Sequence, residues 1–234
     1  MLEICLEHRS NYERIVMILK LKVLGLACVA VLAMSAVVSP AAQATPEFTC
    51  SAYPCSATGS NTAGSETFTT PGGTIQCESH VIWEKYRTLF GEAADGPIST
   101  RTITHKYFGC TAFGFLGATV SMNDCDTEWH ATEKLGEGHY NGHIVTNCPQ
   151  GKRIVITAGT CEVTVDGQSL TTVTTQNNAN GTVTVVPNVT NITMNVVKDG
   201  FGCPFSGTGH VKGSYHGHVV IARVGGGTIS VSGE

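Results

Sequence analysis

LTTVTTQNNANGTVTVVPNVTNITMNVV, residues 170–197, decides the fold class of this chain. Two Thr/Val-rich segments flank the Asn-rich stretch Asn177–Gly181, which ends in Asn-Gly. That pair predicts a β-hairpin, because both residues tolerate the positive φ angles of a tight turn. Within Ile192–Val196 every second residue is apolar, which is the period of a half-buried strand. Pro187 is expected at a strand end or a sheet edge, because proline cannot donate a hydrogen bond to a neighbouring strand.

Short β-prone segments separated by turn residues recur along most of the chain. They are 73–77, 98–107, 118–123, 126–132, 140–147, 152–158 and 160–165. Repeated short strands of this kind predict an all-β fold, an antiparallel β-sandwich. Residues 79–94 are the exception, because their large apolar side chains recur near helical spacing. They predict either one short amphipathic helix or a loop packed on the sheet.

Residues 1–44 have the layout of a secretory signal. Met17–Lys22 is basic, Val23–Val38 is almost entirely apolar, and Ala42-Gln43-Ala44 is a small-residue cleavage site. This pattern predicts cleavage after Ala44, with Met17 as an alternative start. The apolar run is shorter than the roughly 20 residues that a membrane span needs. We therefore expect a secreted, extracellular protein with no membrane span in the mature chain.

Composition divides the remainder into three parts. Residues 45–72 are rich in Ser, Thr, Gly and Pro and predict an irregular arm. Residues 73–165 and 166–234 then form a first and a second β-rich half. A remainder of about 190 residues is long enough to bury a hydrophobic core as one domain or as two small halves.

The cysteines support export independently. Eight of the ten lie after residue 44: Cys50, Cys55, Cys77, Cys110, Cys125, Cys148, Cys161 and Cys203. An even set in an exported chain is typical of a disulfide framework, although eight cysteines permit 105 pairings. Two local pairs are favoured because each closes a hairpin-sized loop, namely Cys110–Cys125 and Cys148–Cys161. Cys203 is then expected to pair with Cys50, Cys55 or Cys77.

Charge and motif content exclude several classes of function. After residue 44 the chain has ten basic and fifteen acidic residues, a net charge of −5, and no basic cluster. Nucleic acid is therefore not an expected partner. The sequence has no Gly-x-Ser-x-Gly elbow, P-loop or dinucleotide fingerprint, so no catalytic residue is assigned from a motif.

One internal similarity bears on both fold and chemistry. Gly138–Val145 (GHYNGHIV) aligns without gaps on Gly213–Val220 (GSYHGHVV), and the match extends weakly over 138–156 and 213–231. One interpretation is a duplication that produces two related β halves. The alternative is that two edge strands share a pattern by convergence, and the sequence leaves both open.

Histidines in this similarity are the candidate metal ligands. His143 and His218 occupy equivalent positions, and His216 shares a strand face with His218. Three imidazoles suit zinc and leave an open coordination position, but these three meet only if the two similar strands lie side by side. The alternative is a solvated sheet face that carries ordinary histidines.

A second candidate face lies in Asp126–His130. Strand alternation places Asp126, Glu128 and His130 on one side and Thr127 with Trp129 on the other. The polar side could bind calcium or supply an acid–base pair. An ordinary half-buried strand with Trp129 in the core is the stronger interpretation, since carboxylates usually lie at the surface.

The spacing of cysteines, aromatic residues and glycines also carries a family resemblance. It rests on Tyr107–Gly114, Asn123–Cys125, the Cys148-to-Cys161 interval, Gly202–Pro204 and Gly213–Gly217. Over about residues 98–234 the chain resembles uncharacterised secreted, cysteine-rich β proteins of actinobacteria. The resemblance implies export and a disulfide-bonded β fold, and it implies no activity.

Two classes of function remain open. The first is an extracellular or cell-envelope binding or structural protein, with a glycan or another wall component as its partner and no cofactor. The second is a secreted hydrolase, zinc-dependent in one version, that uses His143, His216 and His218 with Glu128 or Glu137 as base. Convergence of the histidines in one concave site would favour the hydrolase.

Overall fold

The computed structural model describes residues 45–53, 55–62, 66–84, 100–200, 203–205 and 207–233. The stretch Ala44–Glu234 is a compact unit. The signal and the start site predicted within residues 1–44 lie outside the described residues.

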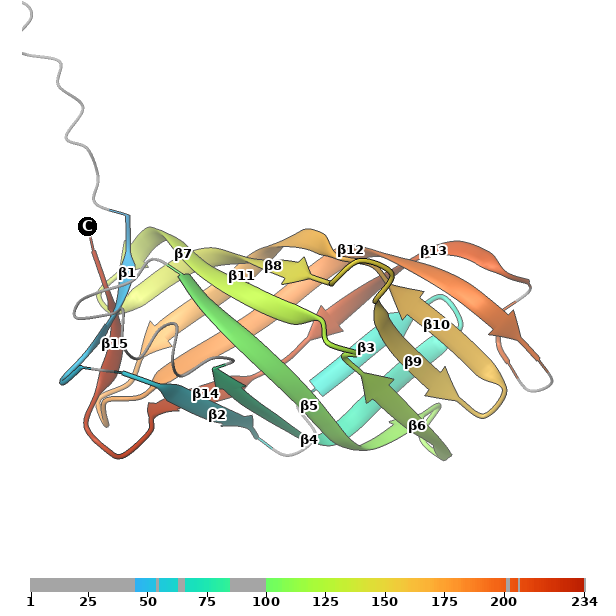
Figure 1. Cartoon of the computed structure of the whole chain (residues 1–234), viewed down its shortest axis with the longest axis horizontal. Helices are drawn as coiled ribbons and strands as arrows, with labels where there is room; N and C mark the ends of the chain where they lie inside the picture. Colours follow the sequence, from blue (N-terminus) through green and yellow to red (C-terminus); the bar gives the residue numbers. More distant parts are fainter. Residues whose placement is uncertain are drawn as a thin grey trace, which may run out of the picture. The chain divides into compact units, whose positions relative to one another are not determined.

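The described residues form fifteen strands and no helix, and every strand pairing is antiparallel. The all-β, antiparallel, sandwich-like fold predicted from the sequence is therefore confirmed (Figure 1). In this part of the chain, no helix is long and apolar enough to cross a membrane. The strands are β1 Glu47–Cys50, β2 Ala57–Asn61, β3 Glu66–Thr70, β4 Gly73–Glu84, β5 Thr100–Ala112, β6 Leu116–Ser121, β7 Asp126–Gly136, β8 His139–Asn147, β9 Ile154–Ala158, β10 Cys161–Val165, β11 Gln168–Asn177, β12 Val183–Asp199, β13 Gly209–His216, β14 Val219–Arg223 and β15 Ile229–Ser232.

Thirteen strands belong to one sheet that folds back on itself and closes in two circuits of paired strands. The first circuit is β4–β5–β7–β8–β11–β12–β14–β2. The second circuit is β4–β5–β6–β9–β10–β12–β13–β3. The long strands β4, β5 and β12 belong to both circuits, and a continuous hydrophobic core runs inside them.

Strands β4 and β5 change the face that they bury where they pass from one circuit to the other. On β4 the buried side chains include Cys77 and then His80, an odd spacing that lies on opposite faces of a regular strand. On β5 they include His105 and then Cys110, which is again an odd spacing. Gly109 between them has a φ of 59°, a conformation that glycine adopts without steric cost. The irregularity lets both circuits point apolar side chains inward.

Strand β12 makes the same change between Val189 and Ile192, which are both buried. The register with β13 shifts there, and Asn191 has a φ of 61°. Asparagine tolerates this left-handed conformation better than most residues. All three shared strands are therefore irregular near the junction of the circuits.

Pro187 lies inside β12 and not at a strand end or a sheet edge, so that prediction was wrong. It sits where the partner of β12 changes from β14 to β13, at a point where a ladder hydrogen bond is not needed. The Pro187 carbonyl instead accepts a hydrogen bond of 3.0 Å from the Gly217 N–H, in the connection between β13 and β14.

The predicted hairpin is confirmed by β11 and β12, which pair from Val173↔Pro187 to Asn177↔Val183. Its loop is longer than a two-residue Asn-Gly turn. The Asn178 N–H donates to the Thr182 carbonyl at 2.9 Å, and Gly181 has a φ of 77°.

Two segments differ from the sequence-based expectation. The Ser/Thr/Gly-rich stretch 45–72 is not an irregular arm, because it contains β1, β2 and β3. Residues 79–84 of the expected helix or loop belong to β4, which is held by pairing with β5 and β2. Residues 85–94 of that segment lie outside the described residues.

The two similar segments adopt different local structures. Gly138 precedes β8, and Tyr140–Val145 lies within that single strand. The corresponding Gly213–Val220 is divided between the end of β13 and the start of β14, with Gly217 and His218 between them. The structure therefore does not reproduce one shared strand in the two segments.

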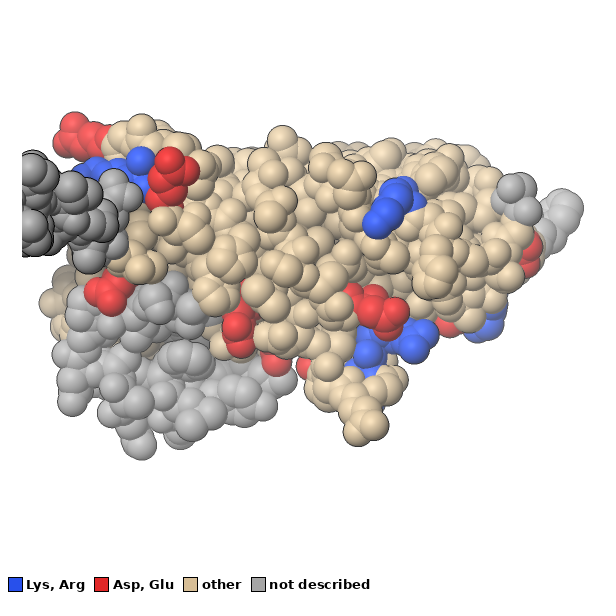
Figure 2. All heavy atoms as spheres, turned by 90° about the horizontal axis from the view of Figure 1, so that it is seen from above, with Lys and Arg blue, Asp and Glu red and all other residues tan. Residues whose placement is uncertain are grey.

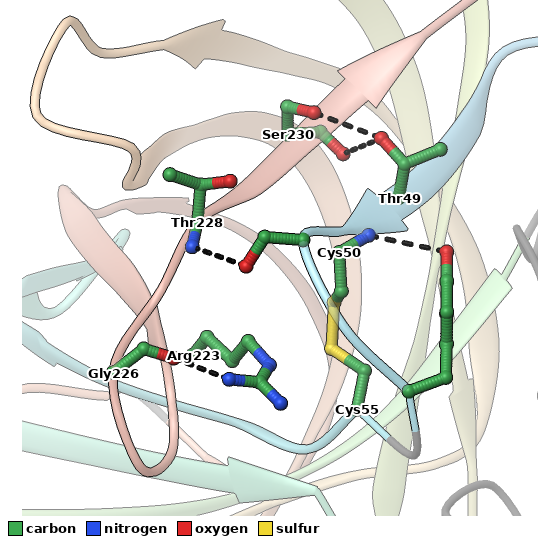
Figure 3. The surroundings of a disulfide bond; sticks show 9 residues. Thr49, Cys50, Cys55, Arg223, Gly226, Thr228 and Ser230 are labelled. Carbon is green, nitrogen blue, oxygen red and sulfur yellow. Dashed lines mark hydrogen bonds between the residues drawn. A yellow bond between two sulfur atoms is a disulfide. The ribbon is translucent and has the colours of Figure 1, made fainter.

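A small two-stranded sheet joins the first described strand to the last. β1 pairs with β15 from Glu47↔Ser232 to Cys50↔Ile229, and Phe48 and Val231 reach the core. Figure 3 shows the Thr49–Ser230 hydrogen bonds at this pairing, beside the Cys50–Cys55 disulfide. The strands pack against β5, β11, β12 and β14, so both are tied to the first circuit.

The described cysteines form four disulfides: Cys50–Cys55, Cys77–Cys110, Cys125–Cys148 and Cys161–Cys203. The expected pairs Cys110–Cys125 and Cys148–Cys161 were wrong, and so was the expectation that Cys203 pairs with one of the first three cysteines. Strand register explains the difference. Cys77 lies directly opposite Cys110 in the β4–β5 ladder. Cys125 and Cys148 are the chain neighbours of Asp126 and Asn147, which pair at the end of the β7–β8 ladder.

Changing Cys125 to Ser tests this pairing. We expect a free thiol at Cys148, and a free energy of unfolding about 3 kcal/mol lower, because a loop of this size contributes that much in the chain-entropy model. Urea unfolding measures the loss, and maleimide labelling followed by peptide mapping locates the thiol. Labelling at Cys110 instead would contradict the structure.

Candidate functional site

Four polar side chains meet inside the molecule at the junction of the two circuits. They are Glu66 on β3, His80 on β4, His105 on β5 and Thr127 on β7. Their exposed fractions are 0%, 1%, 8% and 7%. Each side chain points inward because strand alternation places it on the same face as core residues, as His105 lies between Ile103 and the aromatic Tyr107. Burial at this level requires internal hydrogen-bond partners.

The four side chains form one chain of contacts. His80 Nδ1 lies 3.4 Å from Glu66 Oε1, and His80 Nε2 lies 2.8 Å from His105 Nδ1. His105 Nε2 lies 2.5 Å from Thr127 Oγ1. The His80 ring also stacks on the Tyr107 ring, with centroids 4.3 Å apart. Both imidazole rings are therefore held by contacts at their nitrogens, and the His80 ring is also held by stacking on one face.

The hydrogen bonds are best satisfied when all donors point toward Glu66. Thr127 then donates its hydroxyl proton to His105 Nε2, His105 Nδ1–H donates to His80 Nε2, and His80 Nδ1–H faces the carboxylate. These tautomers are assigned from the network. Both nitrogens of His105 then make hydrogen bonds, whereas His80 Nδ1 lies 3.4 Å from Glu66 Oε1 without a hydrogen bond between them. The arrangement follows the logic of a nucleophile–histidine–carboxylate triad with a second histidine inserted.

Further groups hold the Glu66 carboxyl in place. The Tyr215 hydroxyl donates to Glu66 Oε2, and the His218 backbone N–H donates to Oε1 at 3.4 Å. A Cβ at Gly217 would lie only 2.6 Å from Oε2. The connection between β13 and β14 therefore approaches the carboxyl closely because glycine has no side chain.

The protonation of the rings follows from their burial. Burial lowers the pKa of His105 well below its ordinary value, and the neighbouring His80 lowers it further. Burial, with the Glu66 carboxyl beside it, raises the pKa of Tyr107. Burial and the neighbouring Tyr107 and Glu66 likewise raise the pKa of Tyr215. His105 is thus a neutral base at neutral pH, and both tyrosines keep their hydroxyl protons.

An interior cavity of about 70 Å³ adjoins this polar chain. His105, Tyr107, Thr127, Thr146 and Tyr215 are among the lining residues, and the surface that faces the cavity is almost entirely apolar. Ten apolar side chains from both circuits form the rest of the wall, among them Phe68, Ile144, Ile156, Leu170, Ile192 and Met194. The cavity lies where β6 and β9 diverge from β7 and β8, since β5 pairs with β7 at one end and with β6 at the other.

The structure does not bring the three candidate zinc ligands together. His143 lies on β8, whereas His216 and His218 lie at and after the end of β13, and β11 and β12 separate these strands in the sheet. His218 Nδ1 lies 3.5 Å from Thr62 Oγ1. Among the described residues, no group of three or more His, Cys, Asp or Glu side chains is placed to hold a metal ion.

The alternation predicted for Asp126–His130 is confirmed. Trp129 is buried in the core, while Glu128 and His130 lie on the outer face with 3.6 Å between Glu128 Oε2 and His130 Nε2. The His130 ring stacks on the His143 ring with centroids 4.4 Å apart. Burial and this neighbour lower the pKa of His143. Glu137 is exposed in the turn between β7 and β8.

Sequence reasoning missed Glu66, His80 and His105. Glu66 lies in a stretch that resembled a loop, and His80 lies in a segment of helical spacing. A signal was present for His105, because Ile103, His105 and Tyr107 alternate on one face of a predicted strand. A histidine between two large hydrophobic positions at this period is expected to point into the core.

Charged residues on the face shown in Figure 2 are few and mixed in sign. Ion pairs at the surface include Lys152–Asp124 at 3.5 Å and Arg153–Asp166 at 3.3 Å. On the described part of this face, uncharged residues predominate and no broad basic area is visible.

Comparison of the chain with protein-family models, curated proteins and solved structures finds no match. Its function is therefore inferred from the chemistry of its own residues.

The neutral His105 predicts a specific dependence of stability on pH. Its folded-state pKa is depressed, so the unfolded chain binds more protons below about pH 6.5 and the free energy of unfolding falls as pH falls. We expect His105→Gln to reduce this slope, by up to about 1.4 kcal/mol per pH unit. Urea unfolding between about pH 7.5 and 5.5 measures it, with the exposed His139→Gln as control. Equal slopes in wild type and His105→Gln would contradict a neutral buried His105.

Proposed function

We propose that this disulfide-stabilised β protein is an exported binding protein that takes a small, largely apolar molecule into its interior cavity. The observation that carries the proposal is a cavity with an almost entirely apolar wall that adjoins the buried His105–Thr127 hydrogen bond. Ligand sites commonly combine an apolar wall with a few convergent polar groups. The polar end would receive a hydroxyl or carbonyl group of the ligand.

Cavity size restricts the class of ligand. A volume of about 70 Å³ corresponds to roughly five to seven water molecules, at about 10–15 Å³ each. A cavity of this size with an apolar wall favours small ligands such as short-chain alcohols, ketones or esters. A glycan or wall component remains a proposal for the outer surface alone.

Export is supported by the four disulfides, because such bonds persist in oxidising compartments. If the proposal is correct, protein recovered from the medium of the producing cell begins at Thr45. Its intact mass is lower than that of the reduced chain by two hydrogens for each disulfide. Mass spectrometry before and after reduction measures both values. A chain that retains residues 1–44, or that remains fully reduced, would contradict export.

A series of straight-chain alcohols tests the cavity. We expect affinity to rise about fourfold for each added CH2, because burial of one such group contributes about 0.8 kcal/mol, until the chain no longer fits. Titration calorimetry measures the affinities, and a sharp loss at one chain length locates the limit.

A matched pair of variants distinguishes interior from surface binding. Val120→Phe should abolish 1-butanol binding, because Val120 lines the cavity and the larger ring occupies it. Val197→Phe on β12 should leave binding unchanged, because Val197 is 38% exposed and lies outside the lining. Equal binding by both variants would place the ligand elsewhere and overturn the proposed function.

A further inference from the structure

The Thr127 hydroxyl has the environment of an activated nucleophile. It lies 2.5 Å from His105 Nε2 and begins a chain of contacts that ends at the buried Glu66 carboxyl. Thr127 is also one of the residues that line the cavity. A hydroxyl becomes nucleophilic when an adjacent base takes its proton and a third group orients that base. All three parts are present here, on β7, β5 and β4.

We propose that Thr127 accepts the acyl group of a small ester bound in the cavity, with His105 as general base, so that the protein hydrolyses short-chain esters. This inference rests on the proposed function, because it uses the same cavity. This esterase differs from the hydrolase predicted from the sequence, because His143, His216 and His218 have no part in its reaction.

The step balances without an external oxidant or reductant. Thr127 Oγ1 forms a bond to the ester carbonyl carbon while its proton passes to His105 Nε2. The bond from that carbon to the alcohol oxygen then breaks, and His105 returns the proton to the departing alcohol. Water next attacks the threonyl ester with His105 again as base, which releases the carboxylic acid and restores Thr127. The net reaction consumes one water and yields one acid and one alcohol.

Each partner has a definite role in this reaction. Thr127 and His105 are the catalytic residues, because they touch the reacting atoms. His80 and Glu66 are positioning residues that hold the His105 ring and stabilise the positive charge that develops on it. Tyr107 lines the same cavity, and the contact of its hydroxyl with the Tyr215 hydroxyl is long at 3.5 Å. It is therefore the side-chain donor best placed to stabilise a developing oxyanion.

The cavity limits the acyl group to a short chain. A space of about 70 Å³ accommodates an acetyl or propionyl group, while a larger leaving group has to remain at the side lined by the half-buried Met122 and Leu170. Specificity is thus expected for the acyl part of the ester and not for its alcohol.

The chain contains a matched control hydroxyl. Thr175 on β11 is 5% exposed against 7% for Thr127, and it is not among the residues that line the cavity. His105 Nε2 lies 2.5 Å from Thr127 Oγ1, and no hydrogen bond joins His105 to Thr175 in the described residues. If burial alone made a hydroxyl reactive, both threonines would react.

The experiment uses 4-nitrophenyl acetate with the full disulfide-bonded chain. We expect one equivalent of 4-nitrophenol in a rapid burst and an acetyl group that peptide mapping places on Thr127. Thr127→Val should lose the burst by at least about 100-fold, in line with the usual contribution of general-base catalysis. Thr127→Ser, which keeps a hydroxyl, should restore it, and Thr175→Val should retain it. Acetylation confined to lysines or to the N-terminus, or equal loss in both valine variants, would overturn the inference.

Two further readouts separate this inference from the proposed function. Calorimetric binding of 1-butanol by the same samples reports the cavity directly. Saturable binding without acetylation of Thr127 would reject the nucleophile and leave the binding protein standing, while loss of both would reject both. For the positioning role, His80→Asn should shift the pH profile of the burst, because His105 would lose its Nδ1 partner. An unchanged profile would show that His80 is structural only.

Discussion

A carboxyl group without access to water is the constraint on which the centre of this molecule depends. Glu66 has no exposed surface, and a buried carboxylate is tolerated only when hydrogen bonds and a nearby ring nitrogen replace water. Its partners come from β4, from the end of β13 and from the connection that follows. The absence of a side chain at Gly217 belongs to the same constraint, because any Cβ there would collide with the carboxyl. Segments far apart in the sequence are thus held in one place by one side chain.

The irregular points of β4, β5 and β12 serve this arrangement. Successive side chains on a regular strand point to opposite faces, so only every second residue of such a strand is buried on a given face. A strand that belongs to both circuits can turn its other face inward only where this alternation is interrupted. Gly109 and Asn191 supply left-handed conformations at such shifts. The change of buried face on β4 and β5 lies between the Cys77–Cys110 disulfide and the His80 and His105 rings. Bulges next to functional sites are a recurrent way to re-aim side chains.

Strands with clear alternation of apolar and polar residues could be predicted from sequence, and the short strands rich in Ser, Thr and Gly could not. Strands β7, β8, β11 and β12 were found because apolar and polar residues alternate in them and turn residues separate them. β1, β2 and β3 were missed because they are short and rich in Ser, Thr and Gly, and their stability comes from pairing with distant strands. Disulfide pairing failed for the same reason. Which cysteines meet depends on register across a ladder, and short sequence separation does not determine register.

The candidate site was least accessible to sequence reasoning. Spacing along the chain drew attention to His143, His216 and His218, whereas the residues that do meet are separated by 25 positions between His80 and His105 and by 22 between His105 and Thr127. The pairing of β5 with β4 on one side and with β7 on the other brings them together. A polar residue on the apolar face of a predicted strand is the more informative signal, and His105 is such a residue.

The free-energy cost of burying this chain of polar side chains indicates that the chain has a functional role. Replacing buried ionic groups by well-packed apolar residues is often neutral or stabilising, so such groups are weak contributors to stability. Four disulfides already restrict the unfolded chain, and a continuous apolar core surrounds the junction. Stability therefore does not explain a carboxyl, two imidazoles and a hydroxyl aligned inside the core. Their alignment ends at the hydroxyl of Thr127, a residue that lines the cavity. A proton acceptor beside this hydroxyl can make it nucleophilic, and a purely structural network does not need that property.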